Sequence, residues 1–393
     1  MQNTWFPYFS LADDVSPLKV VSAKGSKLIL ENGKELVDGI SSWWSVCHGY
    51  QNPFIISKME EQLKTLSHVM FGGITHSPAE ELSAKLISFL EAKELSRVFF
   101  SDSGSTAVEV AMKMVIQFWH ESGMPEKNHI LYFEDGYHGE TFAALSVSDS
   151  MQTSFPKIKE TILTKIPNND AEFQEFETLI AKESHKLAGA IIEPILQGAG
   201  GMKIHKPKII KRIWEILQKY NVLIIADECA TGFYRLGTKF AFKQVGLEPD
   251  ILILGKALTA GYIPFAATIA KEFIFQGICE KSRFLHGPTF MANPLCCSAA
   301  IASLELFEAG DYSLKVKEIS QFFSKNLPKG RTIGAVCAFD IHKKQNLEIK
   351  KAVSMGETES FIRPFGETLY LMPPLTISEN ELEVLAKDIL RFT

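Results

Sequence analysis

Between about Arg97 and Ile269, short apolar runs alternate with longer segments in which apolar residues recur at helical spacing. Runs of this kind are typical of buried strands, which are apolar throughout when helices cover both faces of a sheet. The predicted strands are 97–101, 129–133, 188–194, 222–228 and 250–255, and the predicted helices between them include 108–119 and 208–220. The alternation predicts an α/β fold with a mostly parallel sheet.

After about Leu304 the pattern changes to a helix at 314–327, short β-like pieces, and a final helix at 379–392. This part predicts a smaller C-terminal domain. The chain has no internal repeat and no low-complexity linker, so we expect the two parts to share a tight interface.

The composition, with 46% hydrophobic and 22% charged residues among 393, is that of an ordinary globular protein. A net charge of -5 without long basic runs excludes an electrostatic site for nucleic acid or an anionic membrane, and favours small-molecule chemistry. The N-terminus lacks the pattern of a secretory signal, and the apolar runs are too short to span a bilayer. Six scattered cysteines without a CxxC pair indicate no metal site and fit reduced thiols in a cytoplasm.

Four predicted strands end in residues that do not suit packing: 101–104, Glu193-Pro194, Asp227-Glu228 and Gly255-Lys256. In an open α/β sheet, ligands bind beyond the carboxyl ends of the strands. We therefore expect these residues to converge on one crevice.

Asp227 and Lys256 form the strongest candidate pair, because they end successive predicted strands. A desolvated lysine can supply the neutral amine that condenses with an aldehyde. A carboxylate facing a pyridine nitrogen would keep that nitrogen protonated, so that the ring can accept electrons. Taken singly, Asp227 could cap a helix and Lys256 could lie on the surface. The apolar run before Asp227-Glu228 also resembles an ATPase strand, but the chain has no GxxxxGK[ST] loop.

Ser103-Gly104-Ser105-Thr106 stands between a predicted strand and a strong helix, where backbone amides and hydroxyls can bind a phosphate. Simple helix capping is the alternative. The glycine-rich run 198–201 lacks the GxGxxG spacing, and we expect a turn there.

Three further segments carry weaker signals. Tyr137-His138-Gly139 offers an aromatic face at a strand end, suited to stacking on a flat heterocycle, although it could equally be core. The loop 286–290 could contact a phosphate through its backbone and Thr289, or could be only a turn. Arg363 could clamp a carboxylate or form a surface salt bridge.

In their order and rough spacing, Gly104-Ser105, Tyr137-His138-Gly139, Asp227-Glu228 and Lys256 resemble the class III aminotransferases. The resemblance spans nearly the whole chain and is carried by segments 38–53, 68–82, 102–114, 191–202, 225–237, 254–261, 286–295 and 362–374. The paired tryptophans Trp43-Trp44 and the stretch HVMFGGITH are the more specific of these features, and they resemble the members of the family that act in biotin synthesis.

The resemblance implies a fold type I transferase that binds pyridoxal 5'-phosphate, with a seven-stranded, mostly parallel sheet in the large domain and a smaller α+β domain. It implies an N-terminal segment (1–50) contributing to the small domain and substrate pocket, a large cofactor-binding domain (51–300) and a C-terminal small domain (301–393). It also implies a homodimer with active sites at the subunit interface.

The resemblance assigns the site residues as follows. Lys256 would hold the cofactor as a Schiff base and move protons, Asp227 would face the pyridine nitrogen, and Gly104 with Ser105 would bind the phosphate. Tyr137, followed by His138, would stack on the ring. Gly287, Pro288 and Thr289 would reach the phosphate from the partner subunit. The substrate pocket would be shaped by Tyr8, Trp43, Trp44 and Tyr370, with Tyr8 also near the chemistry, and Arg363 would bind a carboxylate.

The implied reaction is transamination of 8-amino-7-oxononanoate to 7,8-diaminononanoate, with S-adenosylmethionine as the amino donor. The chain departs from the family pattern at Phe6, Glu140 and 260–264, and it is shortened after Leu327. Gly198 stands where many ω-amino acid aminotransferases have a glutamate. The alternatives are an aminotransferase for another ω-amino acid or a diamine, the same reaction with lysine as donor, or a non-catalytic binding protein on this scaffold.

Overall fold

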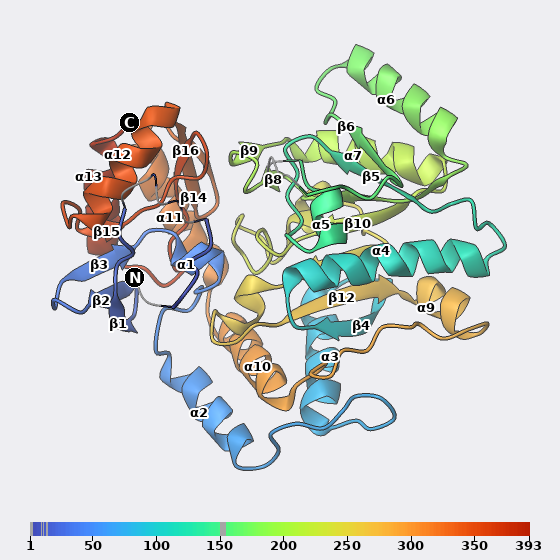
Figure 1. Cartoon of the computed structure of the whole chain (residues 1–393), viewed down its shortest axis with the longest axis horizontal. Helices are drawn as coiled ribbons and strands as arrows, with labels where there is room; N and C mark the ends of the chain where they lie inside the picture. Colours follow the sequence, from blue (N-terminus) through green and yellow to red (C-terminus); the bar gives the residue numbers. More distant parts are fainter. Residues whose placement is uncertain (1–2, 9, 11, 13–14, 150–154) are drawn as a thin grey trace.

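The computed structural model describes residues 3–8, 10, 12, 15–149 and 155–393. The parts of the predicted N-terminal segment at 1–2, 9, 11 and 13–14 lie outside the described residues. Figure 1 shows two bodies side by side, one built around a large sheet and one holding both ends of the described chain.

The large body contains a seven-stranded sheet with the order β4-β12-β11-β10-β7-β5-β6. Its strands are β4 (Leu95–Ser101), β5 (His129–Phe133), β6 (Thr161–Thr164), β7 (Leu187–Ile192), β10 (Leu223–Asp227), β11 (Ile251–Leu254) and β12 (Ala266–Lys271). β12 pairs antiparallel with both β11 and β4, whereas the other pairs are parallel. The prediction of an α/β fold with a mostly parallel sheet is confirmed.

The five predicted strands are all present, whereas β6 and β12 were not predicted. β6 is a four-residue edge strand, and β12 is rich in alanine, so neither stands out as a run of large apolar residues. The direction of β12 follows from its connection, because residues 255–265 are too few for the crossover helix that usually joins parallel strands.

Helices cover both faces of this sheet, and neighbouring residues of one strand belong to different cores. In β11, Ile251 and Ile253 pack with one apolar cluster, while Leu252 and Leu254 pack with the other. This alternation follows from the two-residue period of a strand. The covering helices are α3 (Ser77–Leu90), α4 (Gly104–Glu121), α5 (Phe142–Ser146), α6 (Asp170–Glu183), α7 (Pro207–Lys219), α8 (Ala241–Val245), α9 (Glu272–Cys279) and α10 (Pro294–Ala309).

The second body brings together segments from the two ends of the chain. The N-terminal strands β1 (Val20–Lys24), β2 (Lys27–Leu30) and β3 (Glu35–Asp38) form a sheet with β15 (Ser360–Phe361), which pairs parallel with β3. A second sheet contains β13 (Arg331–Ile333), β14 (Val336–Asp340) and β16 (Thr368–Leu371). Helices α11 (Tyr312–Asn326), α12 (Lys343–Ser354) and α13 (Glu379–Leu390) complete it.

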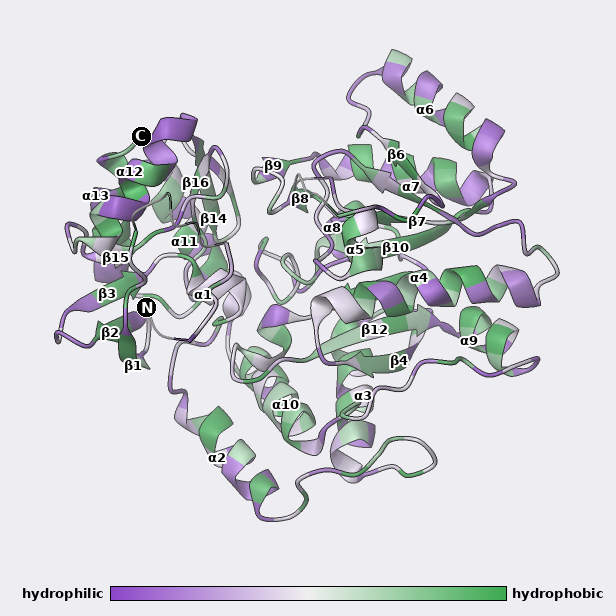
Figure 2. Cartoon of the chain, in the orientation of Figure 1, coloured by the Kyte–Doolittle hydropathy of each residue, from purple (hydrophilic) through white to green (hydrophobic). Residues whose placement is uncertain are grey.

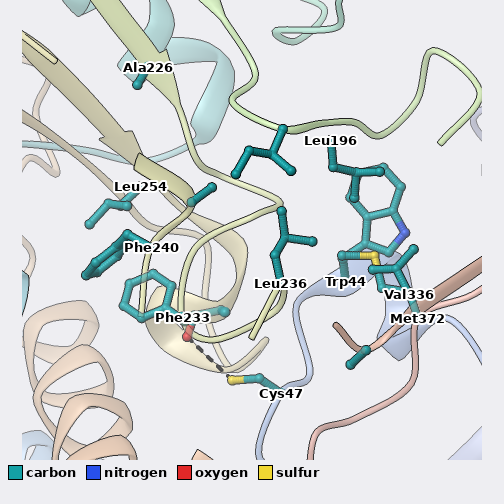
Figure 3. Close-up of a cluster of buried hydrophobic side chains, with 14 of the residues drawn as sticks. Trp44, Cys47, Leu196, Ala226, Phe233, Leu236, Phe240, Leu254, Val336 and Met372 are labelled. Carbon is teal, nitrogen blue, oxygen red and sulfur yellow. Dashed lines mark hydrogen bonds between the residues drawn. The ribbon is translucent and has the colours of Figure 1, made fainter. Parts of the chain in front are cut away.

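Further elements are α1 (Ser41–Trp44), α2 (Pro53–Leu63), which packs against α10, and the hairpin of β8 (Leu196–Gln197) and β9 (Lys203–Ile204). The run 198–201 is a turn in this hairpin, as predicted. Figure 3 shows Trp44 beside Leu196 of the large body and Val336 and Met372 of the second, within one continuous apolar core.

The hydropathy colouring in Figure 2 shows apolar strands inside the large body and helices such as α6 and α7 that are apolar on one side. Among the described residues, no helix has both the length and the apolar character needed to cross a membrane.

Candidate functional site

A cavity of about 310 Å³ lies where the parallel strands end. Residues that follow β4, β5, β7, β10 and β11 all contribute to its wall, so the predicted convergence of strand ends occurs. Its lining residues are Tyr8, Trp43, Trp44, Gly104, Ser105, Tyr137, His138, Gly139, Glu140, Glu193, Ala199, Asp227, Cys229, Ala230, Lys256 and Phe365.

Lys256 enters the cavity from the turn after β11. Its backbone is left-handed, with φ 45°, a conformation that residues with a side chain adopt at some cost and that surrounding contacts must enforce. One such contact is the hydroxyl of Ser303 on α10, which donates to the carbonyl of Ala257 at 3.1 Å. The Nζ of Lys256 lies 4.8 Å from the centre of the Trp44 ring. The amine is therefore held above an aromatic face inside the site.

Asp227 ends β10 with its carboxylate almost fully buried. Its Oδ2 lies 2.8 Å from Nδ1 of His138, and its Oδ1 accepts the backbone N–H of Cys229 at 3.0 Å. Burial by itself raises the pKa of Asp227, but the hydrogen bond with His138 and the nearby charge of Lys256 reverse the effect, so the pKa lies below its ordinary value. Asp227 is thus a buried anion.

The other ring nitrogen of His138, Nε2, is buried and has no hydrogen-bond partner among the described residues. A charged carboxylate can only accept hydrogen bonds, so the hydrogen of the contact with Asp227 comes from the imidazole. The proton therefore belongs on Nδ1, where it is donated to Asp227, and the histidine orients the carboxylate without removing its charge.

The start of α4 offers an anion site on one side of the cavity. The hydroxyl of Ser103 accepts the N–H of Thr106 at 3.2 Å, so the capping alternative is also correct, while the backbone of Gly104 and Ser105 lines the cavity. Gly139 approaches this helix so closely that an added Cβ would lie 2.2 Å from the Oγ of Ser105, and its φ is +117°. Two glycines thus leave bare backbone around a helix N-terminus, which suits a phosphate.

Aromatic residues and one carboxylate form the outer wall. Glu140 accepts hydrogen bonds from the hydroxyls of Tyr137, at 3.0 Å, and Tyr8. The ring of Tyr8 meets that of Trp43 edge-on at 5.9 Å. Burial raises the pKa of Glu140, and it raises the pKa of Tyr137 to about 12, so the hydroxyl of Tyr137 stays protonated and donates to Glu140. This wall links the N-terminal segment to the loop after β5.

Trp44 also lines the cavity and is fixed by its neighbours. Its Nε1 donates to the hydroxyl of Tyr370 at 3.1 Å, and Tyr370 itself is buried behind it. A Cβ added to Gly198 would lie 3.0 Å from the Trp44 ring. The indole therefore occupies the space that a side chain at position 198 would need.

Five of the predicted residues do not line this cavity, and one of them, Tyr370, lies behind Trp44. Arg363 lies beside the cavity, 5.4 Å from the Trp43 ring centre, and lines a second cavity of about 560 Å³ to which Tyr8 also contributes. Gly287, Pro288 and Thr289 do not line the first cavity within this chain. Glu193 lines it, as expected of an acid that ends an apolar strand, whereas Cys229, Glu140 and Phe365 line it without having been predicted as site residues.

The donor set fits pyridoxal phosphate. A bare-backbone cradle for a phosphate, a buried anion for a pyridinium, an amine for an aldehyde and a tyrosine for a flat ring all face one space.

The model of the class III aminotransferase family matches residues 8–392. The chain belongs to the class III aminotransferases. It is therefore a pyridoxal-phosphate-dependent aminotransferase, and the resemblance inferred from sequence motifs is confirmed.

Individual relatives extend this result. The chain is 40% identical to an adenosylmethionine-8-amino-7-oxononanoate aminotransferase from Buchnera aphidicola subsp. Schizaphis graminum, over 99% of this chain and 94% of the relative. It is 35% identical to a Saccharomyces cerevisiae protein of the same name, over 97% and 92%.

Solved structures give the same fold. The omega transaminase from Pseudomonas jessenii in complex with PMP superposes with a TM-score of 0.92 at 26% identity, covering 99% of this chain and 95% of that one. An adenosylmethionine-8-amino-7-oxononanoate aminotransferase from Methanocaldococcus jannaschii superposes with a TM-score of 0.88 at 28% identity, covering 99% and 97%. The fold type I assignment is confirmed.

A Gly198→Ala substitution tests whether this glycine sets the position of Trp44. The added methyl group would push the indole by a few tenths of an ångström. We expect this overpacking to cost ~1–2 kcal/mol and to misplace the substrate wall, so KM for the amino acceptor should rise roughly tenfold while the cofactor still binds. In a Trp44→Phe background, whose smaller ring leaves room, the same substitution should have little further effect. Equal effects in both backgrounds would show that Trp44 does not mediate the change.

Proposed function

We propose that this aminotransferase converts 8-amino-7-oxononanoate to 7,8-diaminononanoate in biotin biosynthesis. The observation that carries the proposal is the shared cavity of Lys256 and Asp227, joined to a phosphate cradle and an aromatic substrate wall. The names of the relatives, at up to 40% identity over nearly the whole chain, support the choice of substrate.

The residues around the cavity would hold the cofactor in a defined orientation. Gly104 and Ser105 would bind its phosphate, Tyr137 would cover the ring, and Asp227 would hold a proton on the ring nitrogen. When bound, pyridoxal phosphate accepts the electron pair left when a C–H bond beside the amino group breaks, and it carries the amino group between substrates. His138 keeps Asp227 in its charged, correctly oriented form.

Lys256 would perform the proton transfers. Its Nζ projects into the cavity above the Trp44 face, where a substrate carbon held by the cofactor would come within reach. A neutral amine can take the proton from that carbon, and the resulting ammonium can return it. The same group would serve in both halves of the reaction, in which the donor loses and the acceptor gains an amino group.

The acceptor is a long aliphatic chain that ends in a carboxylate, and the two adjoining cavities suit both parts. Trp43, Trp44 and Phe365 offer apolar faces for the chain. Arg363 would bind the carboxylate, since its half-buried guanidinium is held beside Trp43 and offers a planar pair of donors. Burial lowers the pKa of Arg363, so a bound carboxylate would compensate for its partial desolvation.

We propose S-adenosylmethionine as the amino donor. The aromatic faces of Tyr8, Trp43 and Trp44 can contact a sulfonium cation, which attracts π-electrons as an ammonium does. Lysine is the alternative donor, because its ammonium could use the same faces and the nearby Glu140. A second candidate function, as an omega transaminase for another amine, is favoured by the superposition on the Pseudomonas jessenii enzyme.

A homodimer in the cytoplasm is the form in which we expect the enzyme to work. Large apolar side chains are exposed on two adjoining segments, which include Met70, Ile74, Leu285 and Phe290, and the rings of His68 and Phe290 lie 4.9 Å apart. Covering this surface with a second copy would let Gly287, Pro288 and Thr289 reach the partner's phosphate site. The six free cysteines support a reducing compartment.

Replacing the lysine tests the reaction. Lys256→Ala removes the amine that binds the cofactor and moves the proton, so we expect turnover to fall by at least about 10⁴-fold. The visible absorbance of the covalently held cofactor should disappear in the same variant. Lys208→Ala, on the exposed side of α7, should retain both properties. Undiminished activity of Lys256→Ala would reject the mechanism.

Arg363→Ala tests the carboxylate site. Loss of a charge-assisted bidentate contact should raise KM for the keto acid by about 10–100-fold, corresponding to ~1.5–3 kcal/mol. The affinity for pyridoxal phosphate should change little. Arg363→Lys keeps the charge without the planar fork and should lie between the two. A variant that loses cofactor but binds the keto acid normally would contradict the assignment.

A half-reaction with each donor identifies the amino source. S-adenosylmethionine, lysine and 4-aminobutyrate would each be mixed with the cofactor-loaded enzyme, and the decay of the cofactor's visible absorbance would be followed. We expect a saturable change with S-adenosylmethionine. A change with 4-aminobutyrate alone would favour the omega transaminase alternative, and a change with lysine alone would revise the donor.

A further inference from the structure

Glu193 is a buried acid in the cavity wall for which the mechanism above has no role. It follows β7, whose six residues are all buried, and its side chain is only 5% exposed. Both carboxylate oxygens accept a backbone N–H group: Oε2 from Tyr137 at 3.0 Å, and Oε1 from Gly198 at 2.9 Å. Each oxygen therefore holds a different segment of the chain.

Both segments contribute to the wall of the cavity, the first through Tyr137 and the second through Ala199. Tyr137 belongs to the loop after β5 and supplies the ring that would cover the cofactor. Gly198 belongs to the turn of the β8–β9 hairpin and lies against Trp44, which in turn lies 4.8 Å from the Nζ of Lys256. One carboxylate thus ties the segment that bears the stacking ring to the segment that lies against Trp44.

We propose that Glu193 is a positioning residue that fixes the spacing of two segments in the wall of the cofactor cavity, by holding the backbone of Tyr137 with one oxygen and that of Gly198 with the other. The inference deepens the proposed function, on which it rests. It requires an acid of this length at this position, because an amide has only one acceptor oxygen and the carboxylate of a shorter side chain is set back from both donors.

Burial and hydrogen bonding act in opposite directions on the charge of Glu193. Burial raises the pKa of Glu193 to about 7, the nearby Asp227 adds to this, and the adjacent His138 and the two N–H groups oppose it. Tyr137, Asp227 and Cys229 are the other titratable groups in electrostatic contact with it. The charged form is the one that can accept on both oxygens.

Glu228 provides a matched control. It is also a fully buried glutamate whose oxygens accept two backbone N–H groups, from Ala241 at 2.7 Å and from Phe242 at 2.8 Å. It holds the start of α8 and does not line the cavity. Replacing either acid by glutamine removes one comparable hydrogen bond, so the two variants should lose similar stability. Only Glu193→Gln should alter the cavity.

The experiment compares Glu193→Gln, Glu193→Asp and Glu228→Gln with the parent enzyme after loading with pyridoxal phosphate. The readouts are the dissociation constant of pyridoxal phosphate, the absorbance maximum and circular dichroism of the bound cofactor, and the melting temperature without cofactor. For Glu193→Gln we expect about tenfold weaker cofactor binding and a changed visible dichroism, because one backbone N–H group in the cavity wall would lose its acceptor. Glu193→Asp should show the same changes, smaller in size, and Glu228→Gln should lower only the melting temperature.

Cofactor affinity and dichroism that match the parent in both Glu193 variants would overturn the inference, as would equal changes in Glu228→Gln. If Glu193→Gln does not fold, the comparison of Glu193→Asp with Glu228→Gln decides the question. A parent enzyme that does not bind pyridoxal phosphate would overturn the proposed function as well, so the two failures are distinguishable.

Discussion

The site depends on a negative charge kept in a nearly dry place. Asp227 lies at the end of a strand that is buried on both faces, where an isolated carboxylate would take up a proton. The hydrogen bond to His138, the N–H of Cys229 and the amine of Lys256 make the anion the favoured form. A permanent anion at this point makes the cavity suited to a protonated heterocycle.

The architecture explains how these groups meet. Parallel strands place their carboxyl ends along one edge, so residues that are far apart in sequence, such as Gly104, Asp227 and Lys256, face a common space. Trp44 lines this space and is held by a hydrogen bond to Tyr370 of β16, so the second body helps to form the wall. The two residues come from opposite ends of the chain. Specificity is thus built where the two bodies meet, and the chemistry is built on the sheet.

Sequence patterns predicted the parts of this arrangement that follow from local rules. Strands β4, β5, β7, β10 and β11 are continuous apolar runs, and the polar residues at their ends could be placed on one edge from the parallel order alone. The antiparallel β12 was missed because its alanines carry little hydrophobic signal, and β6 because an edge strand is short and half exposed.

Within the site, contacts between distant segments could not be predicted. The bond between Asp227 and His138, the sharing of Glu140 by Tyr8 and Tyr137, and the double role of Glu193 all depend on tertiary placement. The motifs identified His138 and Glu193 as residues near strand ends, but not their partners. The position of Arg363 beside a second cavity is likewise a result of how the two bodies pack.

The most direct test of the account is to reduce the cofactor-loaded enzyme with borohydride, digest it, and locate the modified residue by mass spectrometry. Reduction makes the bond between an amine and the cofactor's aldehyde carbon permanent. The account predicts a single phosphopyridoxyl group on Lys256. A label on another lysine, or none on Lys256 in an enzyme that is active, would contradict it.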